Sequence, residues 1–337
     1  MQWFNQIKYR IMNVGKIKSS AEKSLNSLGL SKYLIKYGIL IAFVVICVLL
    51  SLLTPNFFTI QNALNVLRQI SINGILAIGV TFVIIAGGID LSLGSVVALT
   101  GVVAAIFARS ADSLIIVPLL MGVLMGVAVG TVNGLIITKG RVAPFIVTLG
   151  MMTIARGLAL VISNGRPISN LSKSFNFIGG GNLIGIPLPI IIFFLVILLS
   201  TIILNYTIVG RYIYAVGGNE NAAKASGINV NRIKMFTYIM CSGLAGLAGI
   251  ILASRITTGQ PNAGVAYELD AIAAVVIGGT SLSGGVGKIT GTVIGALIIG
   301  VINNGLDLLN ISSYYQQIIK GVIIISAVLI DRKNSHH

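Results

Sequence analysis

Long apolar runs alternate with short polar or glycine-rich stretches along almost the whole chain. A helix needs about 20 mostly apolar residues to cross a bilayer. Ten runs reach or approach this length: Gly38–Leu53, Ala63–Ala86, Ser92–Ala108, Leu114–Thr138, Val142–Ser163, Pro189–Ile208, Met235–Ala253, Leu269–Ile277, Ile289–Leu306 and Tyr314–Ile330. The eighth run is short and several glycines follow it, which predicts a half-helix or a re-entrant segment, since irregular backbone at membrane depth survives only inside protein or beside water. The pattern predicts an all-α polytopic membrane protein with about ten transmembrane helices, some of them broken or re-entrant.

The composition excludes a soluble globular enzyme and a disordered protein. Hydrophobic residues make up 55% of the chain and charged residues 9%, whereas a soluble domain carries roughly 25% charged residues. Histidine occurs only at His336 and His337, and the two cysteines, Cys47 and Cys241, lie in apolar runs. These counts argue against histidine-based catalysis, a disulfide framework and a metal cluster. We therefore expect no catalytic residue, no bound cofactor and no metal.

The net charge of +15 is explained by the predicted topology. With ten spans, one side of the membrane receives Lys8, Arg10, Lys16, Lys18, Lys23, Lys32, Lys36, Lys139, Arg141, Arg211, Lys224, Arg232, Lys234, Lys288, Arg332 and Lys333. The other side receives only Arg68, Arg109, Arg166, Lys173 and Arg255. The positive-inside rule then predicts that both termini are cytoplasmic. Anionic lipid is the partner that this charge suggests, and nucleic acid is not expected.

This topology divides the chain into three parts. Residues 1–36 form a basic cytoplasmic segment, for which an interfacial amphipathic helix and a mobile tail are both open. Residues 37–331 form the transmembrane domain, and its longest predicted cytoplasmic loop is 209–234. Residues 332–337 form a cytoplasmic tail.

Many of the 40 glycines lie within apolar runs at spacings that line one helix face, as Gly122, Gly126 and Gly130 do. Small residues on one face predict close helix packing. Another glycine-rich stretch is repeated: Gly87–Gly94 resembles Gly278–Gly285, and each follows one apolar run and precedes the next. Repeated halves with broken helices are typical of transporters, in which such breaks line the substrate path. Chance similarity between glycine-rich membrane segments is the alternative.

Polar residues in or next to the predicted spans are candidates for a translocation path, because a polar group in a membrane is costly unless it is paired or faces water. We assign to this path Asn73, Asp90, Ser92, Asn303 and Asn304. Amides both donate and accept hydrogen bonds, which suits a neutral polyhydroxy molecule. Two other roles stay open: the asparagines could join helices to one another, and Asp90 and Ser92 could cap the third helix.

The loop 209–234 contains a candidate docking surface. Residues Glu220–Ser226 favour a short helix, which Gly227 would end. A short cytoplasmic helix with small residues can dock a partner, although a solvated connector has the same pattern. Ser283–Lys288 looks like the end of a phosphate-binding loop, but the flanking residues do not fit that motif. We therefore expect no nucleotide-binding motor in this chain.

Seven blocks of sequence carry a family resemblance: Thr54–Thr59, Gly87–Gly94, Gly140–Arg141, Gly210–Asn229, Tyr267–Leu282, Asn303–Leu306 and Ser312–Gln316. Together they look like the membrane permease of a bacterial monosaccharide ABC importer, and the resemblance covers about residues 38–332. This chain departs from the family pattern mainly in its longer, more basic N-terminus, which leaves the contacts of that segment open.

The resemblance implies a permease homodimer in the bacterial cell membrane that moves a small sugar, with ribose expected, by alternating access. A cytoplasmic ABC ATPase, which holds the ATP and Mg²⁺, would dock on a coupling loop made of Gly217, Gly218, Asn219, Glu220, Ala222, Ala223, Ser226 and Gly227. A sugar-binding protein would dock outside. The alternatives are another solute of the same family (a different pentose, a hexose, an autoinducer sugar or a nucleoside) and, from a different class, an ion-coupled secondary transporter.

Overall fold

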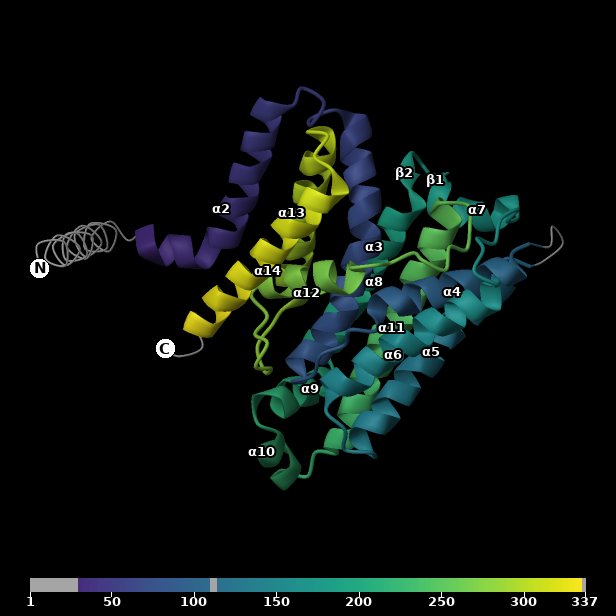
Figure 1. The fold of residues 1–337 in the computed structure, drawn as a ribbon. Helices are drawn as coiled ribbons and strands as arrows, with labels where there is room; N and C mark the ends of the chain where they lie inside the picture. Colours follow the sequence, from purple (N-terminus) through teal and green to yellow (C-terminus); the bar gives the residue numbers. More distant parts are fainter. Residues whose placement is uncertain (1–29, 110–113, 335–337) are drawn as a thin grey trace, which may run out of the picture.

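Long helices run side by side through most of the chain in the computed structural model, which describes residues 30–109 and 114–334 (Figure 1). They are α2 (Leu30–Leu53), α3 (Ile60–Ile85), α4 (Leu93–Phe107), α5 (Ile116–Thr138), α6 (Pro144–Ser163), α8 (Leu188–Tyr206), α11 (Val230–Arg255), α12 (Tyr267–Ile277), α13 (Ile289–Leu308) and α14 (Ser313–Asn334). Within the described residues, six of these helices are long and apolar enough to cross a membrane, namely α3, α5, α6, α8, α11 and α13. The prediction of a helical polytopic membrane protein is confirmed.

Shorter elements connect the long helices. Between α6 and α8 lie α7 (Lys173–Gly180) and an antiparallel pair of two-residue strands, β1 (Asn182–Leu183) and β2 (Ile186–Pro187). Two helices, α9 (Ile208–Gly218) and α10 (Glu220–Ala225), precede α11 and lie at the lower end of the view in Figure 1. The pattern of polar residues had predicted only the second of these helices.

Side-chain caps explain where several helices begin. Their N-cap residues each accept a hydrogen bond from a backbone N–H of the first turn, and these residues are Thr59 (α3), Ser172 (α7), Thr207 (α9), Asn219 (α10) and Asn229 (α11). Such caps satisfy amides that have no partner inside the helix. Thr207 therefore starts a helix that an apolar count does not reveal, because α9 carries tyrosines, glycines and Arg211 among its apolar residues.

The core of the molecule is built around α3 and α4. Every residue of α4 from Leu93 to Ala105 is buried, and α3 is buried almost without interruption from Ile70 to Ile85. By contrast, α2, α6, α8 and α14 expose large apolar side chains, such as Leu52, Val161, Phe194 and Ile318. Exposed apolar faces around a buried centre are what a lipid-surrounded bundle requires, since lipid and not water contacts its outside.

The predicted glycine face of α5 packs against α11. A Cβ on Gly126 would collide with the carbonyl oxygen of Ser242, and one on Gly130 would lie 2.5 Å from the carbonyl oxygen of Tyr238. On the other helix, a Cβ on Gly246 would lie 3.0 Å from the carbonyl oxygen of Gly122. These glycines let the two backbones touch, so the small-residue spacing correctly predicted close packing.

The predicted N-terminal segment 1–36 lies mostly outside the described residues, which begin at residue 30. The described part, Leu30–Lys36, is already helical and belongs to α2. The first long helix thus begins before the boundary that hydropathy had suggested.

Candidate functional site

The predicted short helix in the loop 209–234 is present as α10. Asn219 caps it by accepting a hydrogen bond from the backbone N–H of Ala222 at 2.9 Å, and Ser226 is its C-cap. Gly227 follows with φ +83°, a conformation that glycine adopts without strain. The predicted short helix and its end at Gly227 are therefore confirmed, and the N-cap Asn219 is added by the structure.

Most of α10 faces outward. Glu220, Ala222 and Ser226 are exposed, whereas Ala223 is 4% exposed and holds the helix onto the rest of the protein. The carboxylate of Glu220 also forms an ion pair with Lys234 near the start of α11, with 2.6 Å between Oε2 and Nζ. The helix α10 is thus exposed on most of its surface and is held to the rest of the protein at Ala223 and at Glu220.

The helix before it, α9, ends in a contact with two other parts of the chain. A Cβ on Gly217 would collide with the carbonyl oxygen of Ile85, the last residue of α3. The same carbonyl oxygen accepts a hydrogen bond from the backbone N–H of Gly285, at 2.8 Å. On the other side of this contact, a Cβ on Gly284 would lie 2.8 Å from the carbonyl oxygen of Gly217 and 3.0 Å from Cα of Gly87. We call this meeting of the α3 end, the α9 end and the α12–α13 turn the glycine junction.

The two repeated glycine stretches therefore touch each other, and they share a local structure. After α3, Gly87 has φ +78° and the N–H of Gly88 bonds to the carbonyl of Val83 at 2.9 Å. After α12, Gly279 has φ +84° and the N–H of Thr280 bonds to the carbonyl of Val275 at 3.1 Å. Both helices thus end in the same C-terminal motif with a left-handed residue. The internal likeness seen in the sequence corresponds to two equivalent helix ends, offset by one residue.

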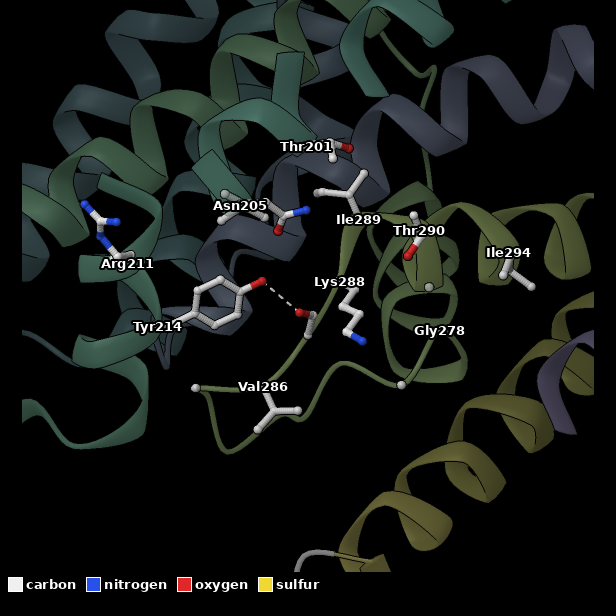
Figure 2. A pocket seen from close by; sticks show the side chains of 15 residues that line it. Thr201, Asn205, Arg211, Tyr214, Gly278, Val286, Lys288, Ile289, Thr290 and Ile294 are labelled. Carbon is white, nitrogen blue, oxygen red and sulfur yellow. Dashed lines mark hydrogen bonds between the residues drawn. The ribbon is translucent and has the colours of Figure 1, made fainter. Parts of the chain in front are cut away.

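A hollow of about 880 Å³ opens beside the glycine junction (Figure 2). Its lining comes from the end of α8, from α9 and from the α12–α13 turn, and includes Asn205, Tyr214, Lys288 and Thr290. The Tyr214 hydroxyl donates to the carbonyl oxygen of Gly287 at 2.8 Å and so ties α9 to the turn. Burial raises the pKa of this phenol above its ordinary value.

Asp90 and Ser92 lie together in a fully buried polar cluster between α3 and α4. The Asp90 carboxylate accepts hydrogen bonds from the backbone N–H of Ser92 at 2.9 Å and from its hydroxyl at 2.6 Å. Asn133 of α5 donates to the same hydroxyl at 3.2 Å. Ser92 is the N-cap of α4, but no side-chain hydrogen bond caps the helix there. The alternative in which Asp90 and Ser92 cap this helix therefore holds only for the position of Ser92: their side chains close a turn, and Ser92 also accepts from α5.

The other three residues assigned to the path are on α3 and α13. Asn304 forms two reciprocal hydrogen bonds with Asn62 of α3, at 2.9 and 2.8 Å, and so joins two helices. Asn303 instead donates to Asp270 at 3.5 Å, on the face of α13 toward α12 and α14. Asn73 is half-buried on α3. The structure thus separates the five residues into different surroundings, and the assignment of all five to one path remains a prediction.

One intramembrane cation holds the loop before α12. Arg156 of α6 donates to the carbonyl oxygens of Pro261 and Ala263, each at 2.7 Å. The loop then leads to Gly264, where a Cβ would collide with the carbonyl oxygen of Gly94 at the start of α4. Arg156 is a charged residue inside the apolar run Val142–Ser163, but the sequence gives no sign of its carbonyl partners, which lie more than 100 residues away.

Comparison with known proteins identifies the family. Residues 62–328 match the family model described as the permease component of the branched-chain amino acid transport system. The chain belongs to this permease family. Membership and the six long apolar helices make it a multi-pass protein of the bacterial inner membrane, a transport component and not a catalytic subunit.

Relatives within the permease family are similar over nearly their whole length. The ribose import permease RbsC of Escherichia coli K12 is 51% identical over 306 residues, which cover 89% of this chain and 95% of that protein. RbsC of Bacillus subtilis is 49% identical, with 89% and 94% covered. The L-arabinose permease AraH of Escherichia coli K12 is 40% identical, with 93% and 95% covered. No solved structure matches the chain.

Proposed function

We propose that this chain is the membrane permease of an ATP-driven importer and that it carries ribose. The observation that supports ribose is the identity of about one half to ribose import permeases of two distantly related bacteria, over about nine-tenths of the chain. The arabinose permease is also a relative, at 40%, so another small sugar of the same family is the second candidate.

We infer ten membrane-spanning segments with both termini in the cytoplasm. Six long helices support this count, α2, α4 and α14 supply three more, and α12 together with the loop before it supplies a re-entrant tenth segment. With 11 residues, α12 is about 16 Å long, roughly half of a hydrocarbon core of about 30 Å. It ends at the glycine junction, beside α9, so in this topology it occupies the cytoplasmic half of the membrane.

The proposed partners are a second copy of the permease, a cytoplasmic ATPase and an extracytoplasmic sugar-binding protein. The ATPase would bind ATP and Mg²⁺ and would dock on the coupling loop Gly217–Gly227. In support, α10 is exposed, capped at both ends and directly continuous with α9. Membrane lipid would surround the exposed apolar faces of α2, α6, α8 and α14.

Alternating access follows from this arrangement. Asn219 alone separates α10 from α9 in the chain, so a displacement of α10 by the docked ATPase would be passed to α9. The glycine junction then connects α9 to the end of α3 and to the α12–α13 turn. Packed helices of this kind have discrete arrangements, so a ligand that binds one of them better shifts the population. ATP binding to the docked ATPase would thereby favour one opening of the path over the other.

Reconstitution tests this proposal. The chain would be placed in liposomes with its ATPase and its sugar-binding protein, and ribose uptake measured with and without ATP. ATP-dependent uptake that requires the binding protein is expected. ATP hydrolysis stimulated by the binding protein without ribose uptake would replace ribose by another solute, and uptake driven by an ion gradient without ATP would overturn the proposal in favour of a secondary transporter.

A further inference from the structure

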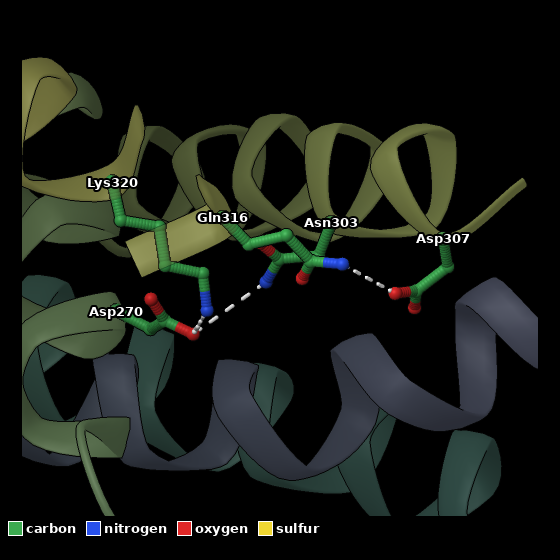
Figure 3. Close-up of polar contacts among 5 residues, drawn as sticks. All are labelled: Asp270, Asn303, Asp307, Gln316 and Lys320. Carbon is green, nitrogen blue, oxygen red and sulfur yellow. Dashed lines mark hydrogen bonds and ion pairs between the residues drawn. The ribbon is translucent and has the colours of Figure 1, made fainter. Parts of the chain in front are cut away.

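Three helices bring five polar side chains into one row, as Figure 3 shows. Asp270 is on α12, Asn303 and Asp307 are on α13, and Gln316 and Lys320 are on α14. Lys320 pairs with Asp270 at 2.8 Å, Asn303 donates to the same carboxylate oxygen at 3.5 Å, and Gln316 donates to Asp307 at 2.8 Å. The row runs from Asp307, which is exposed, to Asp270, which is buried.

The inner end of the row keeps unused hydrogen-bonding capacity. Asn303 is 4% exposed, and its amide oxygen has no hydrogen-bond partner among the described residues. The side chain of Lys320 is 23% exposed, and Asp270 is the one partner of its three N–H donors in the described chain. A buried polar atom without a partner is costly, so such an atom calls for a ligand, a water molecule or a second conformation.

The neighbouring residue shows how a buried asparagine that joins two helices is paired in this protein. Asn304, next in sequence, uses both its amide oxygen and its amide nitrogen in the reciprocal pair with Asn62. Asn303 is as buried, but it makes one long hydrogen bond and leaves its oxygen free. A role in joining two helices therefore accounts for both hydrogen bonds of Asn304, but it does not account for the unpaired amide oxygen of Asn303.

The place of the row in the fold also fits a ligand. Asp270 lies in the first turn of α12. This short helix begins inside the molecule, after the irregular loop whose carbonyl groups bind Arg156. The positive end of a helix stabilises a carboxylate in its first turn. In transporters, discontinuous helices of this kind commonly form the substrate site near the middle of the membrane.

We propose that this row binds the hydroxyl groups of the transported sugar on its way through the membrane. This inference rests on the proposed function, and it adds which side chains contact the sugar and by which hydrogen bonds. Asp270, Asp307 and the free oxygen of Asn303 would accept from hydroxyls, and Lys320 and Gln316 would donate. The ligand class is a small neutral polyhydroxy molecule. In the present conformation the Asp270–Lys320 pair closes the inner end, and the sugar takes over these contacts when α12 and α14 separate.

Uptake of deoxy sugars tests the contact directly. Ribose and its monodeoxy analogues would each be supplied at a concentration that saturates the binding protein, to the wild-type chain and to Asn303→Leu and Asn304→Leu. For Asn303→Leu we expect ribose uptake to fall about tenfold or more, since a buried hydrogen bond is lost. We also expect one analogue to be carried as fast as by the wild type, because it lacks the hydroxyl that Asn303 contacts. Asn304→Leu should lower uptake of every sugar by one common factor.

A second measurement holds even where the leucine variant does not assemble. Asn303→Cys and Asn304→Cys would each be treated with a small polar thiol reagent. The labelling of the wild-type chain, which carries Cys47 and Cys241, would be subtracted as background. Turnover with ATP and loaded binding protein should speed labelling at 303 and leave 304 unchanged. Equal labelling at both positions, a common loss for all sugars in Asn303→Leu, or wild-type uptake in that variant overturns the inference. Failure of the wild type to take up ribose would instead refute the proposed function.

Discussion

Gly285 donates its backbone N–H to the carbonyl oxygen of Ile85 at 2.8 Å, and this bond joins the second repeated glycine stretch to the helix that precedes the first. Ile85 is the last residue of α3, and Gly285 lies in the turn between α12 and α13. Gly217, at the end of α9, packs against the same carbonyl group. Gly217, the first residue of the proposed coupling loop, thus packs against both the end of α3 and the α12–α13 turn.

The glycine junction predicts that an alanine substitution impairs uptake at one of two adjacent glycines and not at the other. Gly217→Ala should reduce ATP-driven uptake strongly, because its methyl group would collide with the carbonyl oxygen of Ile85 and force the backbones apart at a cost of about 1–3 kcal/mol. Gly218→Ala is the matched control, since a Cβ at that position has nothing within 4 Å. Uptake and binding-protein-stimulated ATP hydrolysis would be measured for both. Equal behaviour of the two variants would remove the junction from the coupling route.

The exposed end of α10 predicts a loss of ATPase docking without a loss of folding. Glu220→Lys should weaken co-purification of the ATPase, because it reverses the charge of a partly exposed side chain on the proposed docking surface. Its ion pair with Lys234 is near the surface and contributes less than about 1 kcal/mol, so thermal unfolding in detergent should barely change. Lys224→Glu, on the same helix, tests whether any charge reversal has this effect. Wild-type docking and uptake in Glu220→Lys would contradict the coupling-loop prediction.

The Asn62–Asn304 pair predicts a stability effect that is not additive. Asn62→Leu or Asn304→Leu alone should each destabilise the protein by about 1–2 kcal/mol. Asn62→Leu leaves the Asn304 amide buried without this partner, and Asn304→Leu leaves Asn62 only its hydrogen bond to the carbonyl oxygen of Phe57. Asn62→Leu together with Asn304→Leu should recover much of that loss. Unfolding of the single and double variants by heat or denaturant measures the coupling. Additive losses would show that the two reciprocal bonds do not stabilise the α3–α13 contact.

Arg156 predicts a defect in the loop that leads to α12. Arg156→Met should cost about 1.5–3 kcal/mol of stability and lower uptake, because two backbone carbonyls lose a charged donor. Arg156→Lys keeps the charge and can serve one carbonyl, so its loss should be smaller. Limited proteolysis around residues 256–266 would report loosening of the loop. Identical proteolysis of the wild type and Arg156→Met would argue that the loop is held by its glycine contacts instead.

The membrane-spanning helices could be predicted from the sequence because their signal is local. Each helix needs its own run of apolar residues to satisfy its backbone inside lipid, so the run from Ile289 to Leu306, for example, matches α13 to within two residues. The helix α10 was predictable for the same reason, since Asn219 and Gly227 act within one turn of it. The helix α9 was missed because its start depends on the single cap Thr207 in a polar stretch.

The class of protein, the approximate ends of the spanning helices and the short helix α10 could be predicted from the sequence, because hydropathy and capping are properties of neighbouring residues. Which polar residues meet depends instead on the tertiary packing. Asn303 and Asn304 are adjacent and chemically identical, yet one turns to Asp270 and the other to Asn62, 242 residues away. The rotation of a helix and the identity of its neighbours set those contacts, and they depend on the packing of the whole bundle. The same packing brings Ile85, Gly217 and Gly285 to one point.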